Sequence, residues 1–277
     1  MVNNLEHLSD EEAPNSAASD WDVLSSEKPI EEREYEQNEH SLQDELYSTV
    51  DGRVNTISNV GQELCSIMKD ADHPFSKRLE ENFDGFISSK RLTGRATLEG
   101  LFAYVNAMFP PAFKNEVRDI EKVEDARDLF RQSARREGTQ TADRIDEIAK
   151  TFSVDGSKND LRIASCLRNI GDDSENYAVR LAEAVISYSE NPNDEDNRKK
   201  LNLVQSDHEG ALTTTFFRIA ETFDNSNTEI GKKMFDPTSA LIGTLAVSTD
   251  EYYDGIVKYL RFKIKNSRIP LENQSEK

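Results

Sequence analysis

Apolar residues recur in steps of three and four along most of this chain, and no other feature constrains its fold as strongly. One such face consists of Leu98, Leu101, Phe102, Val105 and Phe109. Pro110-Pro111 ends this face, because proline cannot continue a helix. The two-residue alternation of β-strands is scarce. The sequence therefore predicts an all-α fold, with a multi-helix bundle over residues 78–268.

Local signals predict where several helices begin and end. The sequences SDHE at 206–209 and STDE at 248–251 have the pattern of capping boxes, so a helix is expected to start at each. Asp236-Pro237 predicts another start, with proline in the first turn. Gly171 is expected to close a helix as a C-terminal cap. The polar stretch RQSARREGTQ predicts an internal boundary near residues 131–141.

Residues 42–72 carry a heptad pattern of about three repeats. Its apolar positions include Val50, Val54, Ile57, Leu64 and Met68, and His73-Pro74 ends the segment. Two interpretations remain open. The segment is either a short coiled coil through which these five residues form a homo-oligomer, or an amphipathic helix that packs on its own domain.

The first 46 residues are strongly acidic. They hold 14 acidic and two basic residues, so about −12 of the formal net charge of −19 lies there. Blocks of one sign repel themselves and often serve as interaction tails. Residues 1–41 are rich in Asn, Ser, Glu and Pro and are expected to form a disordered tail. Residues 269–277 are expected to be disordered as well.

Three serines in this region are candidate phosphorylation sites. Ser9, Ser19 and Ser41 each precede an acidic residue by three positions, which is the pattern that acid-directed kinases use. Phosphorylation there would add negative charge to an already acidic segment. The alternative is chance, because serines and acidic residues are both abundant in this part of the chain.

Two short apolar clusters interrupt the tail, Leu5 with Leu8 and Trp21 with Leu24. Trp21 is the one tryptophan of the chain. A disordered segment can present two such anchors to two pockets on a partner. The alternative is that Trp21 folds back onto the helical domain. On the first interpretation Trp21, Leu24, Leu5 and Leu8 are the partner-binding residues.

A basic patch is expected near the C-terminus. It consists of Lys258, Arg261, Lys263, Lys265 and Arg268. Such a patch could bind an acidic protein partner or nucleic acid. The competing interpretation is that these cations complement the dipole of the last helix. Direct binding of nucleic acid is not expected from so acidic a chain.

No catalytic constellation stands out. The four histidines are scattered without metal-ligand spacing, so neither a metal nor a cofactor is expected. Cys166 and His208 are one conceivable nucleophile and base. The stronger interpretation makes Cys166 a core residue and His208 part of a capped first turn. We therefore expect a protein that is not an enzyme.

The two cysteines, Cys65 and Cys166, form no disulfide framework and indicate a reducing compartment. No N-terminal signal pattern is present, and no run of 18 apolar residues occurs. An intracellular, cytoplasmic protein without a membrane segment is expected.

The sequence Asp20-Trp21-Asp22-Val23-Leu24 resembles the motif by which autophagy adaptors bind ubiquitin-like autophagy modifiers. That motif is an aromatic residue, two residues of any kind and a branched aliphatic one, with acidic residues alongside. Trp21 and Leu24 occupy its two anchor positions. The match covers four to six residues of the chain.

The order of segments resembles the phosphoprotein of a non-segmented negative-strand RNA virus, the rhabdovirus type in particular. Those proteins have an acidic, phosphorylatable N-terminus, then a self-association helix, then a helical C-terminal domain. Here these parts correspond to residues 1–40, 42–70 and some part of 80–268. The helical part is longer and more continuous here than the compact domain of that family.

The resemblance implies a non-enzymatic adaptor that binds nucleoprotein and polymerase. In that function the acidic tail mimics the charge of RNA against a basic groove, in the cytoplasm or nucleus of a host cell. The alternative is an adaptor that recruits autophagy modifiers through Trp21 and Leu24.

Overall fold

The computed structural model describes residues 28–153, 156–225 and 228–268, which form α-helices and no β-strand. The helices are α2 (Ile30–Asp70), α3 (Ser76–Met108), α4 (Ile120–Ser153), α5 (Lys158–Glu190), α6 (Glu195–Asp224) and α7 (Glu229–Lys265). The predicted all-α fold is confirmed. The chain divides into two units, residues 1–38 and 39–277, and the bundle belongs to the second.

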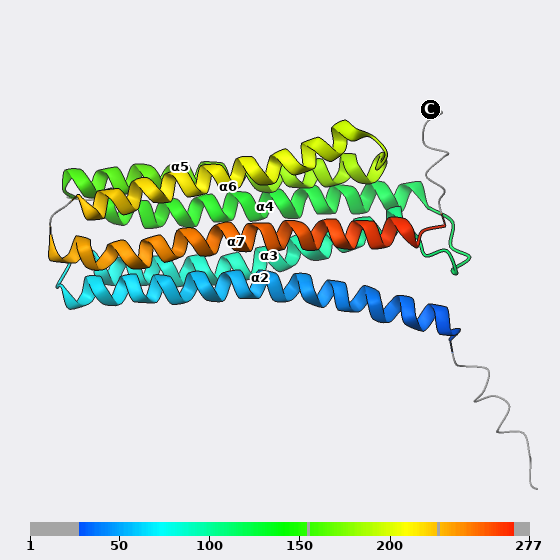
Figure 1. Ribbon diagram of the computed structural model, residues 1–277, viewed down its shortest axis with the longest axis horizontal. Coiled ribbons are helices and arrows are strands. Elements are labelled where there is room, and N and C mark those ends of the chain that lie inside the picture. The colour runs from blue at the N-terminus through cyan, green and yellow to red at the C-terminus, as the bar shows by residue number, and fades with distance from the viewer. Residues whose placement is uncertain (1–27, 154–155, 226–227, 269–277) are drawn as a thin grey trace, which may run out of the picture. The chain divides into compact units, whose positions relative to one another are not determined.

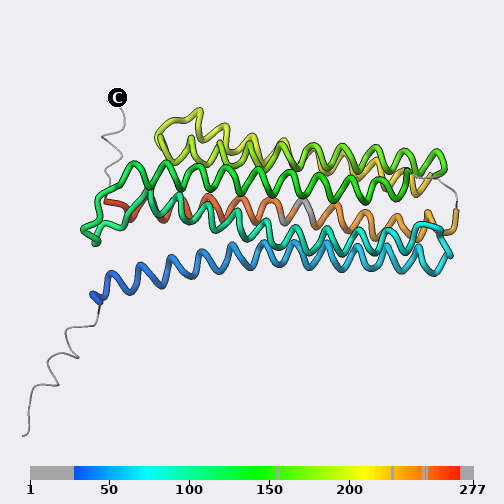
Figure 2. The backbone as a smooth tube through the Cα atoms, turned by 180° about the vertical axis from the view of Figure 1, so that it is seen from behind, coloured from blue at the N-terminus to red at the C-terminus, as the bar shows by residue number. Residues whose placement is uncertain are grey.

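Within the second unit, each helix packs against the one before it, and α7 closes the ring against α2. Contacts join α3 to α4, α4 to α5, α5 to α6 and α6 to α7. Arg95 of α3 pairs with Asp51 of α2, and Lys258 of α7 pairs with Glu45 of α2 at 2.7 Å. The connections are short, so neighbouring helices are antiparallel. Figures 1 and 2 show these helices side by side along one axis.

Buried apolar side chains form two clusters, which we call the first core and the second core. The first core includes Leu98, Leu101, Tyr104, Val105, Leu181, Val185, Ile256 and Leu260. The second core includes Ile57, Met68, Phe86, Ile148, Phe152, Ile163, Phe216 and Leu241. All six helices contribute to both cores, so each helix presents one apolar stripe that fills one core and then the other.

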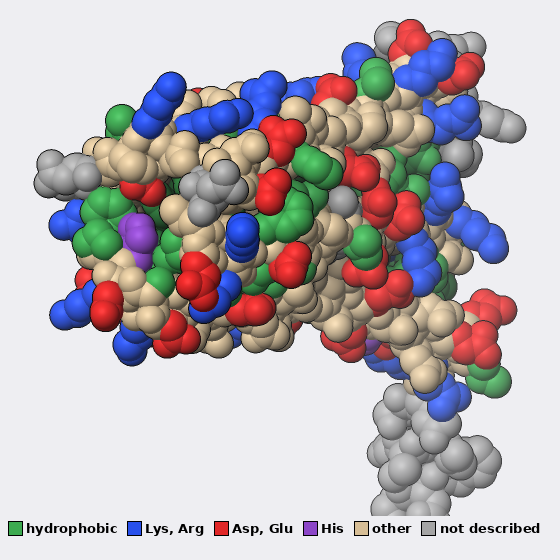
Figure 3. All heavy atoms as spheres, turned by 60° about the vertical axis from the view of Figure 1, so that its left-hand side comes forward, with side chains coloured by type: hydrophobic (Ala, Val, Ile, Leu, Met, Phe, Trp, Pro, Cys, Tyr) green, Lys and Arg blue, Asp and Glu red, His purple; other side chains and the backbone are tan. Residues whose placement is uncertain are grey.

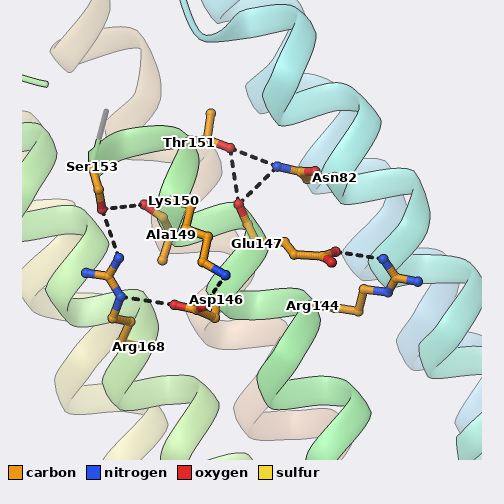
Figure 4. A network of polar contacts seen from close by, with 9 residues as sticks. All are labelled: Asn82, Arg144, Asp146, Glu147, Ala149, Lys150, Thr151, Ser153 and Arg168. Carbon is orange, nitrogen blue, oxygen red and sulfur yellow. Dashed lines mark hydrogen bonds and ion pairs between the residues drawn. The ribbon is translucent and has the colours of Figure 1, made fainter. Parts of the chain in front are cut away.

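Polar contacts fasten the helices around the second core (Figure 4). Asn82 of α3 donates hydrogen bonds to the Glu147 carbonyl at 3.0 Å and to the Thr151 hydroxyl at 2.9 Å on α4. Arg168 of α5 donates to Asp146 and to Ser153, both at 3.0 Å. These contacts tie α3, α4 and α5 together.

The helices begin elsewhere than several sequence signals predicted. The side chains of Ser157, Asp194 and Thr228 cap α5, α6 and α7 by accepting hydrogen bonds from N–H groups of the first turn. The expected starts at 206–209, 236–237 and 248–251 are wrong, because these residues lie inside α6 and α7. Packing of a long amphipathic helix overrides such local signals.

The boundary predicted near 131–141 is also wrong, since α4 runs through it without a break. Gly138, which lies within this stretch, packs against the backbone of α5. A Cβ atom at Gly138 would be 2.8 Å from the Glu175 carbonyl oxygen. Gly171, expected to cap a helix, lies inside α5 opposite Ala142 of α4. Both glycines mark the close approach of α4 and α5.

The start of α2 corrects the extent predicted for the disordered tail. Residues 30–41 are helical, and Glu31 and Glu32 in the first turn complement the helix dipole. Lys28 pairs with Glu36 at 2.6 Å. The predicted stops are confirmed, because α2 ends just before His73-Pro74 and α3 just before Pro110-Pro111.

Candidate functional site

All four N-terminal residues predicted to bind a partner lie outside the described residues. These are Leu5, Leu8, Trp21 and Leu24, and the same is true of the candidate phosphorylation sites Ser9 and Ser19. Ser41 lies within α2, where its side chain is exposed. Ser41 is therefore the one candidate serine among the described residues, and its phosphorylation stays a prediction.

The predicted self-association seam is occupied by the protein's own core. Val50, Val54, Ile57 and Met68 are buried. Leu64 is half-buried and packs against the second core. The coiled-coil interpretation is therefore corrected, because apolar side chains that fill an intramolecular core cannot also form a seam with a second copy. The alternative, an amphipathic helix that packs on its own domain, matches the structure.

The predicted basic patch is divided by the structure. Lys258 pairs with Glu45, and Arg268 donates to the Lys114 carbonyl at 3.4 Å. Arg261 and Lys265 are exposed. Assigning Lys263 to the patch was wrong, because its side chain is 1% exposed.

Lys263 is instead bound inside the bundle. Its Nζ donates to Glu39 Oε1 at 2.9 Å and to Asn106 Oδ1 at 2.5 Å. Burial lowers the pKa of Lys263, while the attraction of Glu39 opposes that shift. Cations and apolar residues alternate in this part of α7, and the sequence alone does not show which of the cations is buried.

A polar layer crosses the bundle between the two cores. Each helix contributes to it at or near the point where its buried face passes from one core to the other. The members are Arg53 on α2, Lys90 on α3, Glu137 on α4, Asp173 and Tyr177 on α5, His208 on α6, and Tyr252 on α7. On α2, for example, Arg53 lies between Val50 of the first core and Ile57 of the second.

An ion pair joins α3 and α4 within this layer. Lys90 Nζ lies 2.5 Å from Glu137 Oε1, with the two side chains 22% and 13% exposed. Lys90 also reaches the Thr141 hydroxyl at 3.4 Å. Burial opposes ionisation of Glu137, but the Lys90 charge and hydrogen bond outweigh it, so the pKa of Glu137 is lowered. Glu137 is therefore ionised at neutral pH.

A histidine–carboxylate pair joins α5 and α6. His208 Nδ1 lies 2.6 Å from Asp173 Oδ2, and the imidazole stacks on the Tyr177 ring with 3.8 Å between centroids. Burial lowers the pKa of His208, and the Asp173 hydrogen bond opposes this shift. The neutral imidazole then donates from Nδ1 to the carboxylate.

These contacts bear on the nucleophile pair that the sequence raised. The polar partner of His208 is Asp173, on α5, and not Cys166. Burial raises the pKa of the Cys166 thiol, which disfavours the reactive thiolate. Cys65 is also buried, and its pKa is raised to about 11. Both cysteines have the properties of core residues.

Arg53 is the half-buried cation that α2 contributes to the polar layer. Its guanidinium lies 5.9 Å from the centroid of the Tyr252 ring, and it acts electrostatically on Glu137, Tyr177 and His208. Among the described residues no ion pair joins Arg53 to a carboxylate, although its charge acts on Glu137 from a greater distance.

A partly open cavity of about 180 Å³ accompanies the layer, with walls from all six helices. Most of the lining is apolar and belongs to the second core, including Ile57, Phe86 and Phe216. The polar lining comes from the layer, notably Arg53 and Tyr177. Sequence reasoning missed this site, although each helix carries a signal for it in the form of a polar residue that interrupts an apolar stripe.

The described part of the chain contains no group of three or more His, Cys, Asp or Glu side chains that could hold a metal ion. None of its helices is both long and apolar enough to cross a membrane.

No family model matches this chain, and neither a curated protein nor a solved structure matches it. What the chain does must therefore be inferred from its own residues.

Proposed function

We propose that this protein is a non-enzymatic adaptor whose acidic N-terminal segment binds a basic surface on a protein partner. The observation that carries the proposal is the segregation of charge. Residues 1–27 contain seven acidic residues and neither Lys nor Arg. On the face of the bundle that Figure 3 shows, acidic and basic side chains are intermingled. A segment of one sign attached to a mixed surface is typical of an electrostatic interaction tail.

The bundle supports this segment as a scaffold. α2 starts at Ile30, directly after the acidic stretch, and continues into the bundle. Its residues Glu39 and Glu45 are paired with Lys263 and Lys258 of α7. These ion pairs engage Glu39 and Glu45 within the bundle. Other acidic residues of α2, such as Glu31 and Glu34, are exposed.

The partner is a protein with a basic groove, and Leu5 and Leu8 supply apolar anchors within it. The resemblance to viral phosphoproteins favours a nucleoprotein kept free of RNA, with a polymerase as a second partner. The long helices of residues 39–265 differ from the compact C-terminal domain of that family. The proposal therefore rests on the acidic segment, and the exposed Arg261 and Lys265 offer a smaller second contact.

The test is affinity capture with the full chain as bait at increasing salt. We expect a basic partner to be captured at low salt and released as salt screens the attraction. Neutralising Asp10, Glu11 and Glu12 to the corresponding amides should remove most of the capture. The matched control neutralises Glu121, Glu124 and Asp125, which are exposed on α4. Equal loss of capture in both variants would contradict the proposal.

A second candidate function follows from the Trp21 and Leu24 spacing. On this interpretation the same segment recruits a ubiquitin-like autophagy modifier, and Asp20 and Asp22 steer it to a basic rim. A pull-down with the purified modifier compares the natural chain with the Trp21→Ala, Leu24→Ala double variant. Binding that is undiminished in the double variant rules this function out.

A further inference from the structure

We propose that the cavity between the two cores is a binding site for a small carboxylic acid with an apolar body. The carboxylate would lie near Arg53 and Tyr177, and the apolar body would lie among side chains of the second core. This inference is independent of the adaptor function, because it concerns the interior of the bundle and not the acidic segment.

The size and lining of the cavity define the apolar part of the ligand. A dry cavity of about 150 Å³ lined by apolar side chains can bind benzene. The present cavity, at about 180 Å³, is slightly larger and is lined by residues such as Ile57, Phe86, Ile148 and Phe216. These dimensions fit an apolar body of about six to eight carbons.

The Tyr177 hydroxyl is an independent sign of a ligand. Tyr177 lines the cavity and is 8% exposed, yet its hydroxyl has no hydrogen-bond partner in the described structure. Buried hydroxyls normally have partners, because leaving one unpaired is costly. A ligand oxygen would supply the missing acceptor.

The charges around the cavity favour an anionic group. Lys90 and Glu137 neutralise each other at 2.5 Å. Arg53 has no such ion pair among the described residues, so two of the three charged side chains on the cavity wall are cationic, and the carboxylate of Asp173 lies behind His208 outside the lining. A carboxylate matches the guanidinium of arginine in both charge and geometry.

A groove on the outside of the bundle shares Arg53 with the cavity, so a ligand would enter past this side chain. The groove has a volume of about 750 Å³ and lies between α2 and α7, lined by small residues that include Gly52, Ala240 and Gly243. Arg53 lines both this groove and the cavity, so its side chain lies at the boundary between them. Glu251 also lines the groove, where its charge would oppose an anion.

The first experiment titrates butanoate, hexanoate and octanoate into the full-length protein by isothermal calorimetry. Each added methylene should strengthen binding about threefold to fourfold. Palmitate is expected to be too large for the cavity, and 1-octanol should bind at least tenfold more weakly than octanoate. Absence of saturable octanoate binding at millimolar concentration, or equal binding of octanol, overturns the proposal.

Removing a positive charge at Arg53 and a negative charge at Glu251 tests whether the ligand is bound as an anion. Arg53→Gln should weaken octanoate binding at least tenfold, whereas Lys69→Gln, an exposed change of equal charge on α2, should leave it unchanged. Glu251→Gln should strengthen binding at low salt. Identical affinities in Arg53→Gln and Lys69→Gln contradict the proposed site.

If Arg53→Gln does not fold, two tyrosine substitutions, one in the cavity and one outside it, still test the proposal. Tyr177→Phe removes a hydroxyl without a partner, so it should preserve stability yet weaken octanoate binding about tenfold. Tyr253→Phe removes a hydroxyl that donates to Asn202, outside the cavity lining. That control should lower stability and leave binding unchanged, and the reverse pattern rejects the proposal.

Discussion

At the residue scale, the buried ammonium group of Lys263 is stabilised by two polar partners. Its ammonium group is almost fully enclosed and contacts Glu39 and Asn106. Transferring a charge from water into a protein interior is costly, and a close opposite charge offsets part of that cost. The two partners are not equivalent, because Lys263 is 1% exposed and Glu39 is 14% exposed, so removing Glu39 leaves the more deeply buried charge without a partner.

This arrangement predicts an asymmetry between two substitutions. Glu39→Gln should lower the free energy of unfolding by about 3 kcal/mol, because it leaves a buried cation without an anion. Lys263→Met should change it much less, since a similar apolar volume replaces the charge and Glu39 can remain partly solvated. Urea denaturation of both variants provides the measurement. Equal losses would show that the pair itself is the stabilising element.

His208 predicts how stability depends on pH. Burial lowers its pKa below the ordinary value of 6.5, although Asp173 opposes the shift and the cations Arg53 and Lys90 reinforce it. As the pH falls below 6.5, the unfolded chain binds a proton that the folded chain does not. The free energy of unfolding should therefore decrease from pH 6.5 down to the pKa of folded His208.

Urea denaturation at pH 7.5, 6.5 and 5.5 measures this decrease. His208→Gln should remove most of it, whereas His40→Gln, an exposed change on α2, should retain it. A decrease that is identical in the natural chain and in His208→Gln would assign the pH dependence to other groups.

Individual side chains also show why the candidate site was not predictable. Arg53, Lys90 and Glu137 lie on three helices, and each resembles an ordinary polar residue in its own segment. Sequence spacing shows which residues share a helix face, but not which faces meet. Lys263 was assigned to the surface for the same reason, because its partner Glu39 is more than two hundred residues away in the chain.

At the scale of helices, the α4–α5 pair depends on Gly138. A Cβ there would meet backbone atoms of Glu175, which cannot rotate away as a flexible side chain can. Gly138→Ala should therefore lower the free energy of unfolding by about 1–2 kcal/mol, despite the better helix propensity of alanine. Gly210→Ala is the control, since no atom lies within 4 Å of its added Cβ, and it should stabilise by about 0.5–1 kcal/mol. Equal effects would refute the close contact.

The same glycine explains what the sequence could and could not predict about helices. Apolar periodicity and the prolines after α2 and α3 located the cores and two helix ends correctly. Gly171 was misread as a helix end, because glycine has the same local signature at a helix end and at a tight helix–helix contact such as that of Gly138. The two uses differ only in the neighbouring helix.

At the scale of the whole molecule, the seam residues of α2 decide the expected oligomeric state. Val50, Val54, Ile57 and Met68 are all below 8% exposed, so the apolar surface that would drive a coiled coil is already covered. A second copy could reach it only by displacing α3 and α7, which would expose both cores. We therefore expect light scattering to give a monomer of 31.4 kDa. A dimer that dissociates in Val54→Asp while the helical content stays intact would instead restore the seam as an interface.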